Sequence, residues 1–197
     1  MPETFKRESK YGLTVLTTTD EGLLLYLRNV QQQVTEWLNT GNVQRLVVVV
    51  QGAETAETLE RWQFNVTVED GSKSIGGGSG GGENATPNET KGDAVGGDGK
   101  KKAPLPTAKS MKEIHNEIQA IIRQITASVT FLPLLQEACT FDLLVYTDKN
   151  LTIPDKWADS DPCYILNSAE VKLRSFTTSV HKVDSMVAYR EAEDWEL

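Results

Sequence analysis

Hydrophobic residues recur at helical spacing in two stretches of the chain. In residues 20–38 the apolar positions are three or four residues apart, which places their side chains on one face of a helix. These positions are Leu23, Leu27, Val30, Val34 and Trp37. Gly41 follows them and is expected to end the helix, because glycine readily adopts the left-handed backbone conformation found at helix ends.

The second helical stripe lies in the C-terminal half of the chain. It comprises Ile114, Ile118, Ile121, Ile125 and Val129. Ser110 and Glu113 precede it at the spacing of a capping box, in which each side chain accepts a hydrogen bond from the other residue's backbone N–H. Pro133 has no backbone N–H and closes the stripe within a turn. The pattern therefore predicts a second long helix.

Strand patterns lie between and after these helices. Residues 46–50 are a leucine and four valines, which favours a strand that is buried on both faces. Residues 61–68 alternate between polar and apolar side chains, as in a strand with one face in water. A short polar turn separates the two runs, so they predict an antiparallel hairpin. Residues 141–146 are a compact apolar run that predicts a central strand.

The last quarter of the chain has a mixed character. Residues 149–167 contain prolines and turn residues and predict an irregular segment, whereas residues 171–176 and 186–189 resemble strands. Helices and strands then follow one another in the order α-β-β-α-β-β-β. This order predicts an α+β domain with a mostly antiparallel sheet packed on helices.

Glycine is concentrated in one segment. Of the 15 glycines in the 197-residue chain, 11 lie between residues 71 and 99. Residues 71–108 contain no aromatic side chain and only seven hydrophobic ones, so this segment cannot bury enough apolar surface to offset the entropy lost on ordering. We predict a disordered glycine-rich insertion, which leaves 159 residues to form the domain.

The charge of the chain restricts its partners. The net charge is −8, and because the insertion carries five lysines and four acids, the remainder carries −9. Such an acidic domain repels polyphosphate, which argues against binding to nucleic acid and to an anionic membrane. No run approaches 18 apolar residues, and the first residues lack a signal-peptide core, so we expect a soluble, intracellular chain.

No catalytic or metal-binding motif is evident. The run GDAVGGDGKKK at 92–102 lacks the spacing of a phosphate-binding loop, so we favour a flexible linker there. The two histidines, His115 and His181, lie in no triad pattern, and we expect structural roles for both. Cys139 is expected to act as a small hydrophobic side chain. No metal-ligand spacing occurs, so we predict no enzyme, no metal and no cofactor.

Six runs of sequence carry a resemblance to a known family. They are KYGLTVL (10–16), VQRLVVVV (43–50), LERWQF (59–64), IIRQITASVTFLPLL (121–135), FDLLVYTDK (141–149) and LRSFTTSVHKVDSMVAY (173–189). In this order they resemble the HORMA domain of the mitotic-arrest-deficient-two family of the spindle assembly checkpoint. The resemblance covers nearly everything outside the insertion and implies a single HORMA domain over 1–197, acting as an adaptor without catalysis.

The resemblance also implies a binding mode. Family members add a short partner peptide as a strand to the edge of the sheet and wrap their C-terminal segment over it as a safety belt. In this chain the belt corresponds to residues 149–197, and we expect it to be mobile. The expected peptide-binding residues are Phe141, Leu143, Leu144, Val145, Tyr146, Thr147 and Trp157. Residues 185–197 would be the closing clasp, with Ser185, Met186, Val187 and Tyr189 as its main residues.

The family forms dimers of an open and a closed conformer through the second long helix. The residues that the resemblance marks for dimerisation are Arg123, Gln124 and Phe131. Arg123 and Gln124 lie between the stripe positions Ile121 and Ile125, so they cannot both join the core. An arginine at such a position offers a planar donor group to an interface. Which conformer this chain adopts is left open by the sequence.

The implied partners are the coiled-coil mitotic-arrest-deficient-one protein, the activator of the anaphase-promoting complex, and an AAA+ remodelling ATPase with its adaptor. Capture of the activator would delay anaphase, and the chain would reside in the nucleus, at kinetochores and in the cytoplasm. Two alternatives remain: another HORMA adaptor, such as a translesion-polymerase subunit or a meiotic-axis protein, and a nucleotide-binding enzyme that uses the glycine-rich loop.

The chain departs from the family in two places. Family members have a core helix before the segment that matches residues 3–5, and this sequence starts without it. Either the sequence is truncated or the protein lacks this helix, and without the helix we expect apolar surface to be exposed in its place. The glycine-rich insertion lengthens a connection that the family keeps short. Because loop entropy grows only logarithmically with length, we expect the insertion to cost about a kcal/mol or two and to leave the fold intact.

Overall fold

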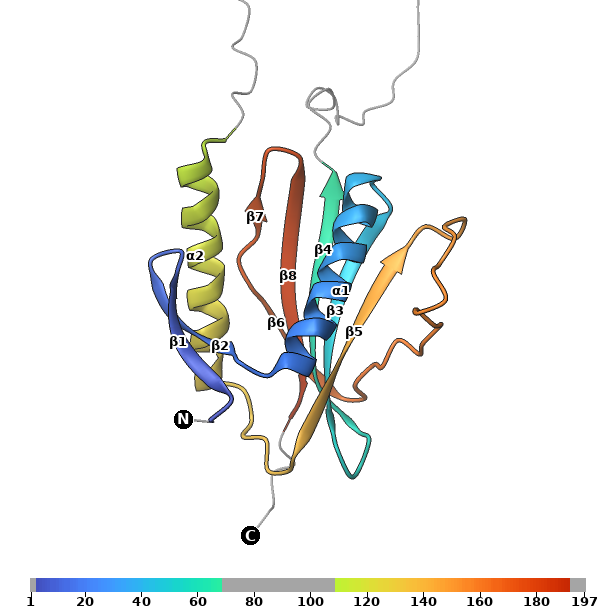
Figure 1. The fold of residues 1–197 in the computed structure, drawn as a ribbon. Coiled ribbons are helices and arrows are strands. Elements are labelled where there is room, and N and C mark those ends of the chain that lie inside the picture. Colours follow the sequence, from blue (N-terminus) through green and yellow to red (C-terminus); the bar gives the residue numbers. More distant parts are fainter. Residues whose placement is uncertain (1–2, 69–108, 192–197) are drawn as a thin grey trace, which may run out of the picture. The chain divides into compact units, whose positions relative to one another are not determined.

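A computed structural model describes residues 3–68 and 109–191 (Figure 1). The insertion predicted at 71–108 and the end of the clasp, 192–197, lie outside the described residues. In chain order the elements are β1 (Phe5–Lys10), β2 (Leu13–Thr18), α1 (Glu21–Asn39), β3 (Val43–Gly52), β4 (Thr58–Val68), α2 (Met111–Ala127), the 3₁₀ turn η1 (Ser128–Thr130), β5 (Cys139–Thr147), β6 (Ser168–Lys172), β7 (Phe176–Thr177) and β8 (His181–Arg190). The predicted α+β class is confirmed.

The main sheet is antiparallel throughout its described pairs. Its strands lie in the order β5-β3-β4-β8-β6, and the short β7 pairs with β8. The last long strand, β8, therefore lies between β4 and β6, and β5 forms the opposite edge. The hairpin predicted for the two N-terminal strands of this sheet is confirmed as β3 and β4, with Val48 opposite Trp62.

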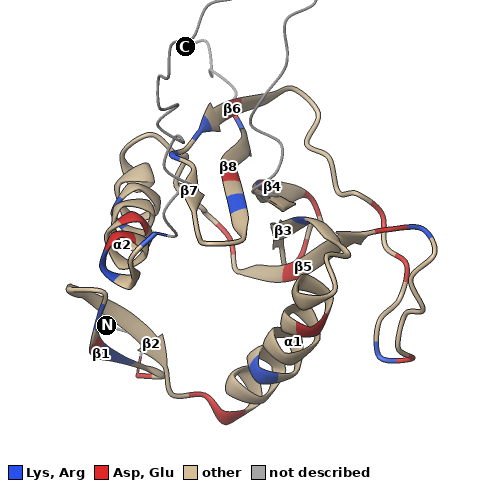
Figure 2. Ribbon diagram, turned by 90° about the horizontal axis from the view of Figure 1, so that it is seen from above, with Lys and Arg blue, Asp and Glu red and all other residues tan. Residues whose placement is uncertain are grey.

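Both helices begin as the sequence predicts. Asp20 caps α1 by accepting a hydrogen bond from the backbone N–H of Leu23 at 2.7 Å. Ser110 and Glu113 form the predicted capping box at the start of α2. Both helices lie on the same face of the sheet (Figure 2). Two ring contacts identify the strand residues on that face. Tyr26 of α1 contacts Phe141 of β5, and Phe131, which follows α2, contacts Tyr189 of β8.

The two faces of the β3–β4 pair differ in how well their hydrophobic side chains are covered. Because strand residues alternate between faces, Val48 and Trp62 lie on the helix side, and both are only half-buried. Val47 and Val49 lie on the opposite face and are 0% exposed. The expectation that the valine run is buried on both faces is therefore wrong for the helix side.

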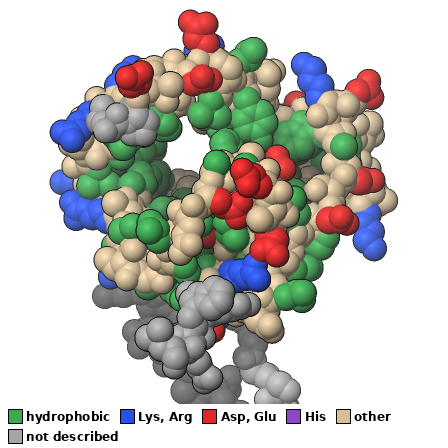
Figure 3. Space-filling model, turned by 90° about the horizontal axis from the view of Figure 1, so that it is seen from below, with side chains coloured by type: hydrophobic (Ala, Val, Ile, Leu, Met, Phe, Trp, Pro, Cys, Tyr) green, Lys and Arg blue, Asp and Glu red, His purple; other side chains and the backbone are tan. Residues whose placement is uncertain are grey.

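An opening bordered by hydrophobic side chains is visible from below (Figure 3). Figure 2 shows α1, α2 and the β1–β2 hairpin spaced around the helix face of the sheet, with no other element between them in the described part of the chain. The half-buried side chains of β3 and β4 face the same side. The helix face of β3 and β4 thus carries half-buried apolar side chains.

Several predictions about local structure need correction. The β1–β2 hairpin was not predicted. The strand expected at 171–176 is divided into β6 and β7, because residues 173–175 leave the sheet and turn toward α2. Cys139, expected to act as a small hydrophobic side chain, is exposed. No helix within residues 3–68 and 109–191 combines the length and apolar character needed to cross a membrane.

Candidate functional site

The edge strand β5 has one unpaired side. It pairs with β3 from Thr147 to Cys139, and no other described strand pairs with it. The backbone N–H and C=O groups along its outer side are therefore available to another strand. Residues that follow β5 do not extend the sheet there. They leave it and reach β6 at the far edge (Figure 1).

The belt runs around this free edge. Asp148, directly before the belt, accepts a hydrogen bond from the Gln44 side chain at 2.5 Å, and turns join Leu151 to Asp148 and Trp157 to Pro154. The next part of the belt, residues 161–167, is named the crossing segment here. Figure 2 shows it on the side of the sheet away from the helices. The belt therefore passes from one face of the domain to the other around β5.

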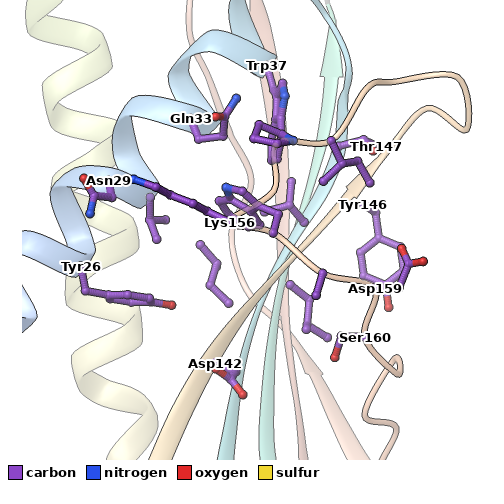
Figure 4. A pocket seen from close by; sticks show the side chains of 18 of the residues that line it. Tyr26, Asn29, Gln33, Trp37, Asp142, Tyr146, Thr147, Lys156, Asp159 and Ser160 are labelled. Carbon is purple, nitrogen blue, oxygen red and sulfur yellow. The ribbon is translucent and has the colours of Figure 1, made fainter.

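A groove of about 1010 Å³ lies between α1, β5 and the belt. Figure 4 shows the side chains of Tyr26, Gln33 and Trp37 coming from α1 on one side of it, with Tyr146 of β5 and Asp159 of the belt on the other. A single added strand needs about 4.8 Å beside β5. The groove thus lies where an extended peptide would pair with that strand.

Two tryptophans join the belt to α1 beside the groove. Trp37 and Trp157 pack edge to face with ring centroids 5.0 Å apart. Trp37 is 5% exposed, so it anchors the belt to the buried side of α1. Aromatic pairs in this geometry contribute about 0.5–1.5 kcal/mol beyond the area they bury. This contact fixes the position of the belt relative to the helix.

The groove contains both charged and aromatic groups. Asp142 and Asp159 supply carboxylates, and Lys156 supplies an amine. Burial raises the pKa of the Tyr26 phenol, and the nearby Asp142 carboxylate raises it further. The phenol therefore stays protonated at neutral pH and can donate a hydrogen bond.

The Cys163 thiol lies in the crossing segment. Burial raises its pKa first, Asp161 and Asp142 raise it further, and Arg61 acts in the opposite direction. The thiol therefore carries little thiolate at neutral pH, which lowers its reactivity. Among the described residues no cluster of three potential metal ligands occurs.

The structure brings together most of the residues expected to bind a peptide. Leu143, Leu144, Val145, Tyr146, Thr147 and Trp157 all line the groove. Phe141 does not line it; this side chain is 44% exposed and packs against Tyr26 with ring centroids 6.1 Å apart. The α1 residues of the groove were missed by the sequence analysis, although Trp37 was recognised as part of the apolar stripe.

The expected clasp residues lie in β8, away from the groove. Ser185, Met186, Val187 and Tyr189 pair with β4 on one side, and the last three also pair with β6 on the other. Ser185 and Val187 are buried. These residues therefore contribute a central strand of the sheet, and their removal would leave β4 and β6 without a common partner.

The expected dimerisation residues lie at the end of α2, and two of them contact the C-terminal segment. Arg123 is exposed. Gln124 accepts a hydrogen bond from the backbone N–H of Arg174 at 2.7 Å. Phe131 is 40% exposed and its ring centroid lies 6.0 Å from that of Tyr189. The end of α2 and the residue that follows η1 are thus connected to the belt.

Comparisons with known proteins define the class of this domain. A family model described as the HORMA domain matches residues 2–181. The chain is 52% identical over 193 residues to the mitotic spindle assembly checkpoint protein MAD2A of Dictyostelium discoideum, covering 98% of this chain and 81% of that protein. It is 48% identical over 188 residues to the human protein of that name, covering 95% and 78%.

A solved structure has a similar fold. One chain of the crystal structure of the mitotic checkpoint complex superposes with a TM-score of 0.74 at 38% identity, covering 96% of this chain and 85% of that one. The domain is thus of the HORMA type. The chain belongs to the HORMA-domain family and, within it, to the MAD2 group of spindle checkpoint proteins.

Proposed function

We propose that this chain is a spindle assembly checkpoint adaptor that captures a short segment of its partners beside β5 and encloses it with the belt, residues 149–197. It acts by binding and not by catalysis. By capturing the activator of the anaphase-promoting complex, it inhibits that complex and delays anaphase. The relatives named MAD2A and the similarity to a chain of the mitotic checkpoint complex support this role.

The free edge of β5 is the observation that carries the binding mode. The outer side of β5 is unpaired among the described strands, and the belt passes beyond it without filling the position of a neighbouring strand. Addition of a peptide strand would satisfy the free backbone groups of β5, and alternate peptide side chains would enter the groove.

The proposed partners follow from this role. They are the coiled-coil mitotic-arrest-deficient-one protein, the activator of the anaphase-promoting complex, and an AAA+ ATPase with its adaptor that reopens the belt. A second copy in the open conformer would dock on Arg123, Gln124 and Phe131. We place the chain in the nucleus, at kinetochores and in the cytoplasm, where these partners act.

The experiment that tests strand addition uses modified peptides. A fluorescein-labelled peptide that carries the adaptor-binding segment of the activator is made in two forms, N-methylated at odd or at even positions. Only one set of N–H groups faces β5 in an added strand, so one form should lose binding in fluorescence anisotropy and the other should keep it. Equal binding by both forms, or no binding of the unmodified peptide, would contradict the proposed function.

A further inference from the structure

Arg61 is a buried cation beneath the crossing segment. It lies in β4 on the face away from the helices and is 5% exposed. Its Nε donates a hydrogen bond to the carbonyl oxygen of Pro162 at 3.1 Å, and its Cζ lies 4.9 Å from the centroid of the Tyr164 ring. Both contacts join β4 to a part of the chain about a hundred residues later. They exist only while the belt crosses the sheet.

The same guanidinium is fixed by the sheet. Nη1 donates to Gln63 Oε1 at 2.7 Å, and Nη2 donates to the Tyr146 hydroxyl at 3.3 Å. Tyr146 belongs to β5, which carries the free edge. One planar side chain therefore contacts β4, β5 and the belt at once, which the single ammonium group of a lysine cannot do.

The charge of Arg61 has an unusual environment. None of the ion pairs among the described residues includes it. Its partners are instead a carbonyl, an amide, a hydroxyl and an aromatic ring. A buried charge is costly unless hydrogen bonds replace its hydration. The belt supplies the carbonyl and the ring. Arg61 therefore has its full set of partners when the belt lies in the observed position.

The backbone of the crossing segment is constrained on both sides of Tyr164. Cys163 and Asn167 have φ angles of 50° and 54°, in the left-handed region that residues with side chains seldom occupy. Such conformations persist where surrounding contacts hold them in place. The contacts of Arg61 with Pro162 and Tyr164 fall directly beside the first of these two residues.

We propose that Arg61 is the residue that positions the belt across the outer face of the sheet, by holding the Pro162 carbonyl and the Tyr164 ring against β4 and β5. This inference rests on the proposed function, in which the belt retains a captured peptide. Arg61 is a positioning residue, because it does not line the groove itself and acts through Pro162, Tyr164 and Tyr146, which do. It sets how long a captured peptide is retained.

The test compares Arg61→Lys with Tyr164→Leu. Lysine keeps the charge but lacks the planar guanidinium with its several N–H donors. Release of the labelled activator peptide should therefore be about tenfold faster, which corresponds to the loss of one charge-assisted hydrogen bond. Leucine removes the ring, and release should be about threefold faster, as for a cation–π contact. The double variant should release no faster than Arg61→Lys alone. Tyr164 is 66% exposed, so its replacement leaves the fold intact.

Arg45→Lys is the matched control. Arg45 lies on the same face, stacks on Tyr146 at 5.2 Å and donates to Asn65 Oδ1 at 2.8 Å, with no described contact to the belt. Its replacement should change release less than twofold. If Arg45→Lys and Arg61→Lys accelerate release equally, or if the effects of Arg61→Lys and Tyr164→Leu simply multiply in the double variant, the proposal is wrong.

A second measurement separates this inference from the proposed function. Hydrogen exchange of the chain without peptide should show faster exchange over 163–167 in Arg61→Lys and Tyr164→Leu, with α1 and β3 unchanged. Unchanged exchange over 163–167 would overturn the role of Arg61 even if peptide capture is normal. Failure of the wild-type chain to bind the peptide would instead count against the proposed function, and the exchange result would still decide on Arg61.

Discussion

The side-chain oxygen of Gln124 accepts a hydrogen bond from the backbone N–H of Arg174 at 2.7 Å. Gln124 lies in the last turns of α2, and Arg174 lies in the segment between β6 and β7. Nearby, Glu117 accepts a hydrogen bond from the backbone N–H of Thr177 at 2.8 Å. Two side chains of α2 thus bind backbone N–H groups just before and within β7, which connects the helix surface to the belt.

Replacement of Gln124 by alanine should affect two properties together. Loss of the bond to Arg174 is expected to lower the free energy of unfolding by about 1 kcal/mol, because the backbone N–H loses its partner. It should also weaken the proposed dimer. Arg123→Ala is the matched control: Arg123 is exposed, so only dimerisation should fall. Thermal melts and sedimentation measure the two properties, and equal melting losses in both variants would contradict this assignment.

Ser185 should respond in opposite ways to two small substitutions. Its Oγ is buried and makes no hydrogen bond with the described residues, and the side chain is 4% exposed. Ser185→Ala removes an unsatisfied polar group, so stability should be unchanged or higher. Ser185→Asp buries an unpaired carboxylate in β8 and should cost more than about 3 kcal/mol. Urea denaturation of the two variants gives the comparison, and a mild effect of aspartate would show that β8 leaves the sheet easily.

The contact between α2 and β7 should weaken in acid. The hydrogen bond from Lys109 lowers the pKa of Glu117 below its ordinary value of 4.5, and the Thr177 N–H lowers it further. Because the folded-state pKa is the lower one, this stabilisation is present above pH 4.5 and is lost as the pH falls through the folded-state value. Glu117→Gln should flatten the acid limb of a stability profile, whereas Glu54→Gln, in the exposed β3–β4 turn, should leave it unchanged.

Replacement of residues 71–108 by a short Gly-Ser linker should leave the domain functional. The closure entropy of a loop changes by only about 0.6 kcal/mol for each halving of its length, so stability should rise slightly. Binding of the activator peptide should be retained. The same variant tests the nucleotide-binding alternative, because that activity would depend on the glycine-rich loop. Loss of peptide capture would show that the insertion takes part in binding.

The opening on the helix face should bind a fluorescent apolar dye. Val48, Trp62 and Phe64 face this side and are half-buried, so apolar surface remains accessible to small molecules. We expect dye fluorescence to rise in the folded chain and the melt to be broad. A sharp two-state melt without dye binding would show that this face is sealed in solution.

Periodic segments were the easiest to predict. The alternation in 61–68 and the capping residues Ser110 and Glu113 are local signals, and each fixes its element without help from the rest of the chain. The β1–β2 hairpin was missed because its turn, Tyr11-Gly12, lacks the usual asparagine or aspartate before the glycine, although both residues have positive φ angles of 48° and 69°. Its strands are also short and largely polar.

The path of the belt could not be predicted in the same way. Residues 149–167 have no hydrophobic period, and their position depends on contacts with distant residues, such as Trp37 with Trp157 and Arg61 with Pro162. Arg61 itself looked like the polar position of an alternating strand. Only the crossing of the belt turns that solvent face into a buried one, and this property belongs to the tertiary structure.

The complete burial of Val47 and Val49 has a consequence for how the adaptor responds to temperature. These side chains are 0% exposed and lie on the same face of the sheet as Arg61, which contacts the crossing segment. We expect that lifting the belt exposes apolar surface on this face, including the aliphatic part of Arg61. Exposure of apolar surface raises the heat capacity, so opening should have a positive heat-capacity change and a curved van't Hoff plot. Partner retention would then vary with temperature as the stability of a small hydrophobic core does.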